Sequence, residues 1–270
     1  MPPFDLNHYH TLNAAPSVGA ASSVGATVRY REQTASTMDD ARAGADAGAD
    51  VGTAYVAGEQ TAGRGRQRRT WLSQPGGGLA VTFHLRPAHT ENAPLLSAAG
   101  ALAAADAIRE TSGVATDIKW PNDVLYEGRK LVGVLAEARH GAALDVFLGI
   151  GINVRDLRDP PEELLTTATS IEGAGGDPPD IEHLLAALSH SLQRWSDLLD
   201  ADPTALIEEW RGRLITIGTR IRLATPSGVV EGEALDVSEH GELVLRLDDG
   251  TTQPFSAGDV TTAPPLSSGQ

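Results

Sequence analysis

An arginine- and glycine-rich segment, GEQTAGRGRQRRTW over residues 58–71, holds the side chains best suited to binding an anion. It sets Arg64 and Arg66 next to Gly63 and Gly65, so guanidinium groups stand beside flexible backbone N–H donors. Guanidinium forks and clustered backbone amides both match the oxygens of phosphates and carboxylates. We therefore predict a phosphate-binding loop, with a solvated basic loop or a nucleic-acid contact as the alternative. The Rossmann and P-loop glycine patterns are both missing from the chain, so neither fold is indicated.

Lysine is rare in this sequence, and its two lysines, Lys119 and Lys130, lie close together in two strongly patterned segments. Lys119 belongs to DIKWPNDVLY, in which Pro121 biases Trp120 toward extended backbone and ends a strand in a turn. An ammonium group at a strand end can hold a carboxylate or an α-phosphate as a compact point charge. Chance clustering of two surface lysines is the alternative explanation.

Two further polar residues, Asn122 and Asp123, follow Lys119 in the same motif. Their side chains could join an anion site. Asn and Asp are also common in turns, because their side chains form hydrogen bonds with the local backbone. On the residues alone, turn chemistry is the better explanation of both.

The composition restricts the classes of function. The chain has 36 acidic and 21 basic residues, and its net charge of −15 disfavours broad binding to nucleic acid or to an anionic membrane. An anion site must therefore be local. No apolar run approaches the ~18 residues that a membrane helix needs, and the start MPPFDLNHYH lacks the pattern of a signal peptide. We expect a cytoplasmic protein without a membrane partner.

Cysteine and histidine contribute no recognisable site. The absence of cysteine excludes a thiolate nucleophile and a cysteine zinc site, and the eight histidines form no H-x-x-x-H pair beside a glutamate. A chain this acidic and poor in lysine suggests halophilic adaptation to a high-salt cytoplasm. Full activity at low salt would contradict that hypothesis.

Strands and helices with short connections must bring these segments together. Strand patterns cover residues 27–32, 54–60, 77–86, 116–120, 130–139 and 143–154. Helix patterns begin after a cap at Ser36 or Thr37 and cover 94–110, 181–200 and 203–213, while residues 155–180 are irregular. Consecutive strands joined by short turns favour an antiparallel or mixed sheet, so we predict an α+β fold.

The pattern changes near Thr219 to short alternating segments separated by SG, HG and DG turns, which is typical of a small β-barrel. We divide the chain at these changes of pattern. The predicted parts are a flexible leader over 1–26, an α+β domain over 27–214, a β-barrel over 215–262 and a disordered tail over 263–270.

Four motifs occur in a characteristic order and spacing: GRGRQRRTW, KWPNDVL, KLVGVLAE and GIGINV. Together they resemble the biotin protein ligases, from STM at 36–38 to GIGINV at 149–154. The resemblance implies a mixed β-sheet backed by helices, related to class II aminoacyl-tRNA synthetases and lipoate ligases, with a C-terminal SH3-like β-barrel. The domain over 27–214 would be catalytic.

The resemblance also implies a two-step reaction. Biotin and Mg²⁺-ATP would give biotinyl-AMP and pyrophosphate, and a lysine of a biotin carboxyl carrier protein would then attack the mixed anhydride. Adenylation is needed because a free carboxylate is a poor electrophile. Three carboxylates are candidates near the Mg²⁺: Asp117, Asp123 and Glu137.

The resemblance implies roles for individual residues of this chain, according to their positions in the family's motifs. The residues implied to bind biotin are Ser36, Thr37, Met38, Gln60, Arg64, Gly65, Arg66 and Lys119. Those implied to bind ATP or the adenylate are Arg66, Trp71, Lys119, Asn122, Lys130 and Asn153. Lys119, Arg64 and Arg66 are implied to be catalytic, with Lys119 bridging the biotin carboxylate and the α-phosphate.

Several of these residues have a second explanation or depart from the family. Ser36 fits a helix cap, Trp71 an ordinary core position, and Lys130 a solvated surface. Met38 stands where family members often carry Asn, and Arg68 replaces a glycine of the family's GRGRxGRxW loop. The second change affects loop closure or carrier preference more than the activity itself.

Three other functions fit parts of the pattern. A lipoate or octanoate transferase has a related fold, but it lacks the GRGR loop in this setting. A DNA-binding biotin repressor needs an N-terminal winged helix, for which residues 1–26 are too short, so we expect no DNA partner. An RNA-binding module built on the arginine loop would not label a carrier. A homodimer is compatible with the sequence, which does not fix the oligomeric state.

Overall fold

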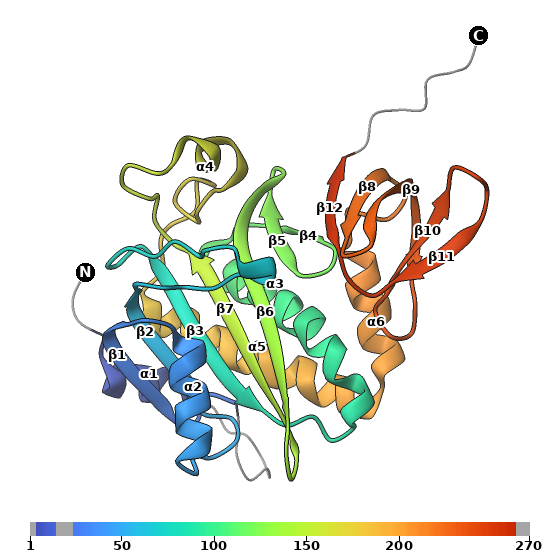
Figure 1. Ribbon diagram of the computed structural model, residues 1–270. Helices are drawn as coiled ribbons and strands as arrows, with labels where there is room; N and C mark the ends of the chain where they lie inside the picture. Colours follow the sequence, from blue (N-terminus) through green and yellow to red (C-terminus); the bar gives the residue numbers. More distant parts are fainter. Residues whose placement is uncertain (1–3, 15–23, 263–270) are drawn as a thin grey trace.

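A computed structural model describes residues 4–14 and 24–262. Its larger part is a seven-stranded sheet with the order β1-β2-β3-β7-β6-β5-β4 (Figure 1). The strands are β1 (Val28–Thr34), β2 (Ala54–Gln60), β3 (Gly78–Leu85), β4 (Asp117–Lys119), β5 (Asp123–Tyr126), β6 (Arg129–His140) and β7 (Leu144–Asn153). β1 and β2 pair in parallel and the other neighbours pair antiparallel, which confirms the predicted mixed sheet.

Helices cover both faces of this sheet. On β7, adjacent residues point to opposite faces: a Cβ at Gly149 would lie 3.0 Å from Met38 of α2, while Leu148 lies against Gly100 of α3. α5 packs beside α3 on that second face (Figure 1). The helices are α1 (Leu6–Asn13), α2 (Thr37–Asp46), η1 (Arg66–Arg68), η2 (Thr90–Leu95), α3 (Leu96–Ser112), α4 (Glu162–Thr167), α5 (Ile181–Ala201) and α6 (Pro203–Gly212).

The C-terminal strands form a separate antiparallel sheet with the order β11-β10-β9-β8-β12. Its strands are β8 (Arg220–Thr225), β9 (Gly228–Val237), β10 (Leu243–Leu247), β11 (Thr252–Phe255) and β12 (Asp259–Thr262). Trp120, before a cis bond to Pro121, fastens this unit to the larger one. Its backbone N–H donates to Thr216 Oγ1 and its indole N–H to the Gly241 carbonyl, both over 3.0 Å.

The N-terminal segment differs from the prediction. We expected a flexible leader over 1–26, but Leu6–Asn13 forms α1 and packs on α5. Tyr9 is fully buried and its hydroxyl donates to the Gly25 carbonyl over 2.7 Å. An eight-residue helix with one buried residue has too weak a period to stand out in the sequence. The tail over 263–270 and residues 15–23 of the leader lie outside the described residues.

Two short elements were also missed, namely β5 and α4, which lie in segments predicted to be a turn and an irregular stretch. Across the described part of the chain, no helix combines the length and the apolar character that crossing a membrane requires.

A buried charge cluster under α2 leads to a stability prediction. Asp145 is 7% exposed and contacts His84 Nε2 at 2.8 Å, Arg86 Nε at 2.7 Å and an Arg139 guanidinium nitrogen at 3.1 Å. Burial alone would raise the pKa of Asp145, but these three hydrogen bonds outweigh it and hold that pKa well below the usual range.

We expect Asp145→Asn to lower the free energy of unfolding by about 3 kcal/mol at neutral pH, because it breaks a buried pair. The pKa of Asp145 is lower in the folded than in the unfolded protein, so its stabilisation is complete above the unfolded value of ~3.9 and decreases as the pH falls below it. Denaturant unfolding at several pH values measures this.

The control is Asp46→Asn, which removes an exposed partner of the same Arg139. It should cost less than ~1 kcal/mol. A difference between wild type and Asp145→Asn that stays constant down to acidic pH would contradict the role of the ionised carboxylate.

Candidate active site

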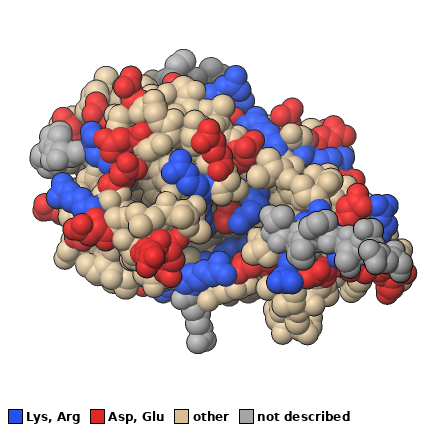
Figure 2. All heavy atoms as spheres, turned by 90° about the horizontal axis from the view of Figure 1, so that it is seen from above, with Lys and Arg blue, Asp and Glu red and all other residues tan. Residues whose placement is uncertain are grey.

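A cavity of about 590 Å³, called here the main cavity, opens on the face of the large sheet that carries α2. Figure 2 shows the molecule from above Figure 1, with Lys and Arg side chains, and Asp and Glu side chains among them, around a hollow. The basic residues that line it are Arg64, Arg66, Arg69, Lys119 and Lys130. In a chain of net charge −15, this group of basic side chains is the candidate for the local anion site predicted from the composition.

Polar groups at the start of α2 form one part of the wall. Ser36 and Thr37 are both buried, and the Ser36 side chain makes no capping hydrogen bond. Gln60 Oε1 accepts from the Thr37 backbone N–H over 2.8 Å and from the Thr37 hydroxyl over 3.1 Å. That hydroxyl also pairs with Thr82 Oγ1 at 2.8 Å. These contacts fix a polar surface that can form hydrogen bonds with a small polar ring.

The indole of Trp71 lies across the middle of the sheet, over two glycines of neighbouring strands. A Cβ at Gly151 would come within 2.5 Å of this ring and one at Gly133 within 2.8 Å. Only glycine leaves enough room at these positions. The glycines of GIGINV and KLVGVLAE therefore make room for the indole of Trp71.

The arginine-rich segment is a compact loop above this surface. Its ends are tied by hydrogen bonds from Gly65 N to the Arg69 carbonyl, 2.8 Å, and from Trp71 N to the Gly63 carbonyl, 2.9 Å. Arg64 leaves the loop toward α2 and pairs with Asp39 at 2.6 Å. The guanidinium of Arg64 is therefore already held by a carboxylate at the rim.

Arg66 joins the loop to two other parts of the protein. One guanidinium nitrogen donates to Asn122 Oδ1 over 3.3 Å, and another donates to the Gly258 carbonyl over 3.2 Å. Burial lowers the pKa of the Arg66 guanidinium, while the nearby carboxylates of Asp259 and Asp123 oppose that shift. Arg66 still stays charged, because an arginine is not deprotonated in proteins.

The C-terminal β unit thus contributes directly to the site. Asp259 begins β12, lines the main cavity and forms an ion pair with Arg69. The sequence predicted none of these contacts, since about 190 residues separate the two partners. A lone Asp in a β-rich segment carries no local signal of such a role.

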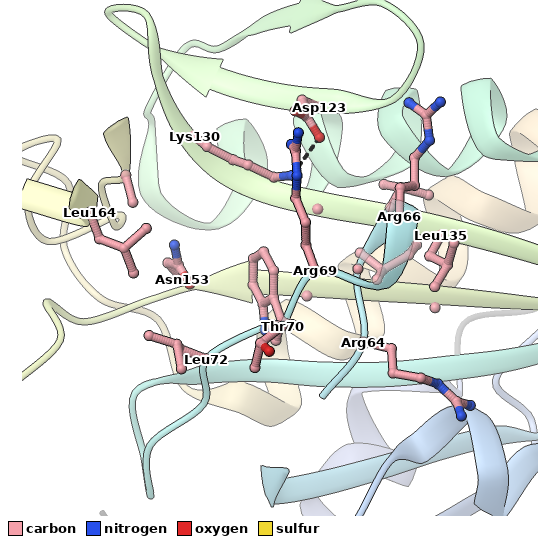
Figure 3. A pocket seen from close by; sticks show the side chains of 18 of the residues that line it. Arg64, Arg66, Arg69, Thr70, Leu72, Asp123, Lys130, Leu135, Asn153 and Leu164 are labelled. Atoms are coloured by element: carbon pink, nitrogen blue, oxygen red, sulfur yellow. Dashed lines mark ion pairs between the residues drawn. The ribbon is translucent and has the colours of Figure 1, made fainter. Parts of the chain in front are cut away.

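Both lysines of the chain meet at one carboxylate. Lys119 Nζ lies 3.7 Å from Asp123 Oδ2, and Lys130 Nζ lies 2.6 Å from Asp123 Oδ1. All three residues line the main cavity. Figure 3 shows this ion pair of Lys130 and Asp123 above the cavity.

The end of the main cavity opposite Arg64 and Arg66 is more apolar. Figure 3 places Asn153, Leu72 and Leu164 at this end, and Arg64, Arg66 and Leu135 at the other. The Asn153 amide donates to the Thr169 carbonyl over 2.9 Å. Leu164 comes from α4, in the stretch predicted to be irregular, and sequence reasoning gave no reason to include it.

Comparison with known proteins supports one family. A model of the Biotin/lipoate A/B protein ligase family matches residues 32–153, and the Biotin protein ligase C terminal domain matches 216–261. A biotin--[acetyl-CoA-carboxylase] ligase of Mycobacterium tuberculosis is 38% identical over 84% of this chain and 86% of its own length. This chain belongs to the biotin protein ligase family.

Solved structures of other ligases have the same architecture. A biotin protein ligase from Aquifex aeolicus in complex with biotin and ATP matches with a TM-score of 0.76 and 28% identity, over 87% of this chain and 97% of that one. One from Leishmania major in complex with biotinyl-5-AMP matches with a TM-score of 0.57 and 27% identity, over 86% of this chain and 99% of that one.

Most of the residues singled out in the sequence of this ligase meet in the main cavity. Those that line it are Ser36, Thr37, Met38, Gln60, Arg64, Gly65, Arg66, Trp71, Lys119, Lys130 and Asn153. Asn122 is the exception. It is buried behind Arg66, its amide donates to the Val134 carbonyl, and it lines a separate cavity of about 400 Å³. Its contacts hold Arg66 in place rather than face the main cavity.

Of the three carboxylates considered for Mg²⁺, only Asp123 lines the main cavity. Asp117 is exposed on β4 and Glu137 pairs with Arg42. Among the described residues, no group of three or more His, Cys, Asp or Glu could hold a metal ion.

Proposed function

We propose that this ligase activates biotin with Mg²⁺-ATP in the main cavity and transfers it to one lysine of a biotin carboxyl carrier domain. The observation that carries the proposal is the cavity itself. Residues from all four motifs line it, and so do both lysines of an acidic chain. The ligases of known structure with similar folds bind biotin, ATP or biotinyl-5-AMP.

The order of groups along the cavity suggests where each substrate lies. We place the ureido ring of biotin against Ser36, Thr37 and Gln60, because a buried polar ring needs hydrogen-bond partners. The adenosine would occupy the opposite end, with its base near Trp71 and Asn153. The biotin carboxylate and the α-phosphate then meet in the basic middle.

In the first step a biotin carboxylate oxygen attacks the α-phosphorus and the bond to pyrophosphate breaks. Lys119 and Arg66 stabilise the negative charge that grows on the oxygens around the phosphorus. Mg²⁺ supplies further neutralisation of the triphosphate. In the second step the carrier lysine attacks the carbonyl carbon, and AMP leaves.

Incubation with biotin, Mg²⁺-ATP and a carrier domain, followed by intact-mass analysis, tests the whole proposal. One added biotin is expected, and none when ATP is omitted or when the acceptor lysine of the carrier is replaced by arginine. Biotin-dependent exchange of pyrophosphate into ATP tests the first step alone. Exchange with lipoate but not with biotin would overturn the proposal.

The remaining expectations extend this function. We propose residues 27–214 as the catalytic domain and 215–262 as the β-barrel domain, with the boundary between the end of α6 and the start of β8. A cytoplasmic location and halophilic adaptation also remain predictions, and activity measured across a range of salt concentrations tests the second.

A further inference from the structure

The side chain of Met38, the second residue of α2, makes part of the main cavity apolar at the end proposed for the biotin ring. Met38 is 3% exposed and lines this cavity. It packs in a small apolar cluster with Ala41, Tyr55 and Phe147. Leu135 packs against the same cluster and also lines the cavity (Figure 3). Met38 and Leu135 therefore form an apolar corner that is supported by packed side chains.

This apolar corner meets the polar wall over Gly149 of β7. A Cβ at Gly149 would lie 3.0 Å from the Cε methyl of Met38 and 3.5 Å from Thr82 Oγ1. The Thr82 hydroxyl pairs with the hydroxyl of Thr37, which donates to Gln60. The Met38 methyl and the hydrogen-bonded wall therefore stand next to each other above one glycine.

Biotin has a head group with the same two kinds of surface. One of its fused rings is a ureido ring, which has two N–H donors and a carbonyl acceptor. The other is a sulfur-containing ring that has no N–H or O–H group. A buried polar ring needs hydrogen-bond partners, whereas an apolar ring is stabilised by contact with apolar side chains. With the ureido ring against the polar wall, the sulfur-containing ring reaches the corner of Met38 and Leu135.

We propose that Met38 is a specificity-determining residue that contacts the sulfur-containing ring and so favours biotin over ureido compounds that lack this ring. The polar wall cannot make this distinction, because Thr37 and Gln60 would meet the same ureido groups in both. Methionine suits the contact, since its flexible thioether adapts to irregular surfaces. The inference rests on the proposed function, because it takes biotin as the ligand of the main cavity.

The test compares biotin with desthiobiotin, which keeps the ureido ring and the carboxylate chain but has no sulfur-containing ring. Calorimetry measures the Kd of both ligands for the wild type, Met38→Ala and Met38→Leu. In Met38→Ala the Kd of biotin is expected to rise at least ~10-fold, the usual cost of a lost apolar contact in a pocket. The Kd of desthiobiotin should change much less. Met38→Leu keeps an apolar side chain of similar volume, so it should retain most of the preference.

Tyr55→Leu is the matched control. Tyr55 packs in the same apolar cluster as Met38, but it does not line the main cavity. Replacing its ring loosens the packing under α2 without removing a ligand contact, so the Kd values of biotin and desthiobiotin should change by the same factor. Thermal unfolding of every variant separates lost stability from lost recognition.

Met38 can also be observed in the unmodified sequence, because Met1 and Met38 are the only methionines of the chain. After labelling with [methyl-¹³C]methionine, the methyl signal that is missing from the spectrum of Met38→Leu belongs to Met38. Biotin is expected to shift this signal of the wild type more than desthiobiotin does. This measurement does not depend on the stability of Met38→Ala.

Two results would overturn the inference. One is a ratio of the two Kd values that stays at the wild-type level in Met38→Ala. The other is a Met38 methyl signal that does not move when the wild type is saturated with biotin. Failure of the proposed function would look different, since the wild type would then bind no biotin, or would bind it without catalysing biotin-dependent pyrophosphate exchange.

Discussion

Replacing Lys119 with alanine is expected to lower the rate of biotinyl-AMP formation by at least ~10²-fold, the usual cost of losing a group that stabilises developing charge. Lys119 stands at the end of β4, lines the main cavity and has its ammonium near the carboxylate of Asp123. Biotin should still bind measurably, because the polar wall formed by Thr37 and Gln60 does not depend on this lysine.

The fold should tolerate the change. Asp123 keeps its closer partner, Lys130 at 2.6 Å, so Lys119→Ala does not leave a carboxylate without a counter-charge. Lys130→Ala serves as the comparison, since it removes the other lysine from the same carboxylate. Exchange of labelled pyrophosphate into ATP measures the first step, and calorimetry measures biotin binding. Wild-type exchange in Lys119→Ala would contradict the role given to this residue.

The sequence predicted the sheet well where a strand is a long, mostly apolar segment. β2, β3, β6 and β7 were all anticipated within a few residues, because each contains several buried apolar residues. Two short elements had no such pattern. β5 has four residues inside a motif typical of a turn, and α4 has no buried residue at all. Neither carries a pattern that distinguishes it from a loop.

The residues of the candidate site could be predicted from the sequence only where they belong to compact motifs. Gln60 illustrates what the motifs leave out. It was expected to face the biotin head group, but its side chain also accepts the N–H of Thr37, the first residue of α2. That contact joins α2 to β2 and becomes visible only when the two elements are packed together.

Long-range contacts were the least predictable part. The Gly258 carbonyl and the Asp259 carboxylate reach the arginine loop from the far end of the chain, and no spacing rule connects them with Arg66 and Arg69. The role of Asn122 was also not predictable from the sequence. Turn chemistry and ligand binding were both considered for it, whereas the structure uses its side chain to support Arg66.

The arginine loop departs from the family's sequence pattern, and its backbone conformation can be compared with that departure. Arg68 replaces the family's glycine, yet the residue with left-handed backbone is its neighbour Gln67, at φ 53°. Non-glycine residues adopt this conformation with some strain. The turn is therefore made one position earlier than a glycine at position 68 would suggest.

Replacing Arg66 with glycine is expected to let biotinyl-AMP escape and label lysines of bystander proteins. The guanidinium links the loop to Asn122 and to the Gly258 carbonyl, and it lines the cavity where the adenylate would form. Losing a charged hydrogen bond of about 1.5–3 kcal/mol corresponds to release that is ~10- to 100-fold faster. Gel filtration of the complex followed by mass analysis of an added lysine-rich protein measures both effects.

Arg66→Ala and Arg66→Lys separate the causes of this leak. Alanine removes the guanidinium without the extra backbone freedom of glycine, so a leak as large as that of Arg66→Gly assigns the effect to the side chain. Lysine keeps the charge but cannot reach Asn122 and Gly258 together as a fork does, so it should leak to an intermediate degree. If Arg66→Gly retains the adenylate and stays selective for the carrier, the loop is closed by other contacts, with the Arg69–Asp259 ion pair as the first to examine.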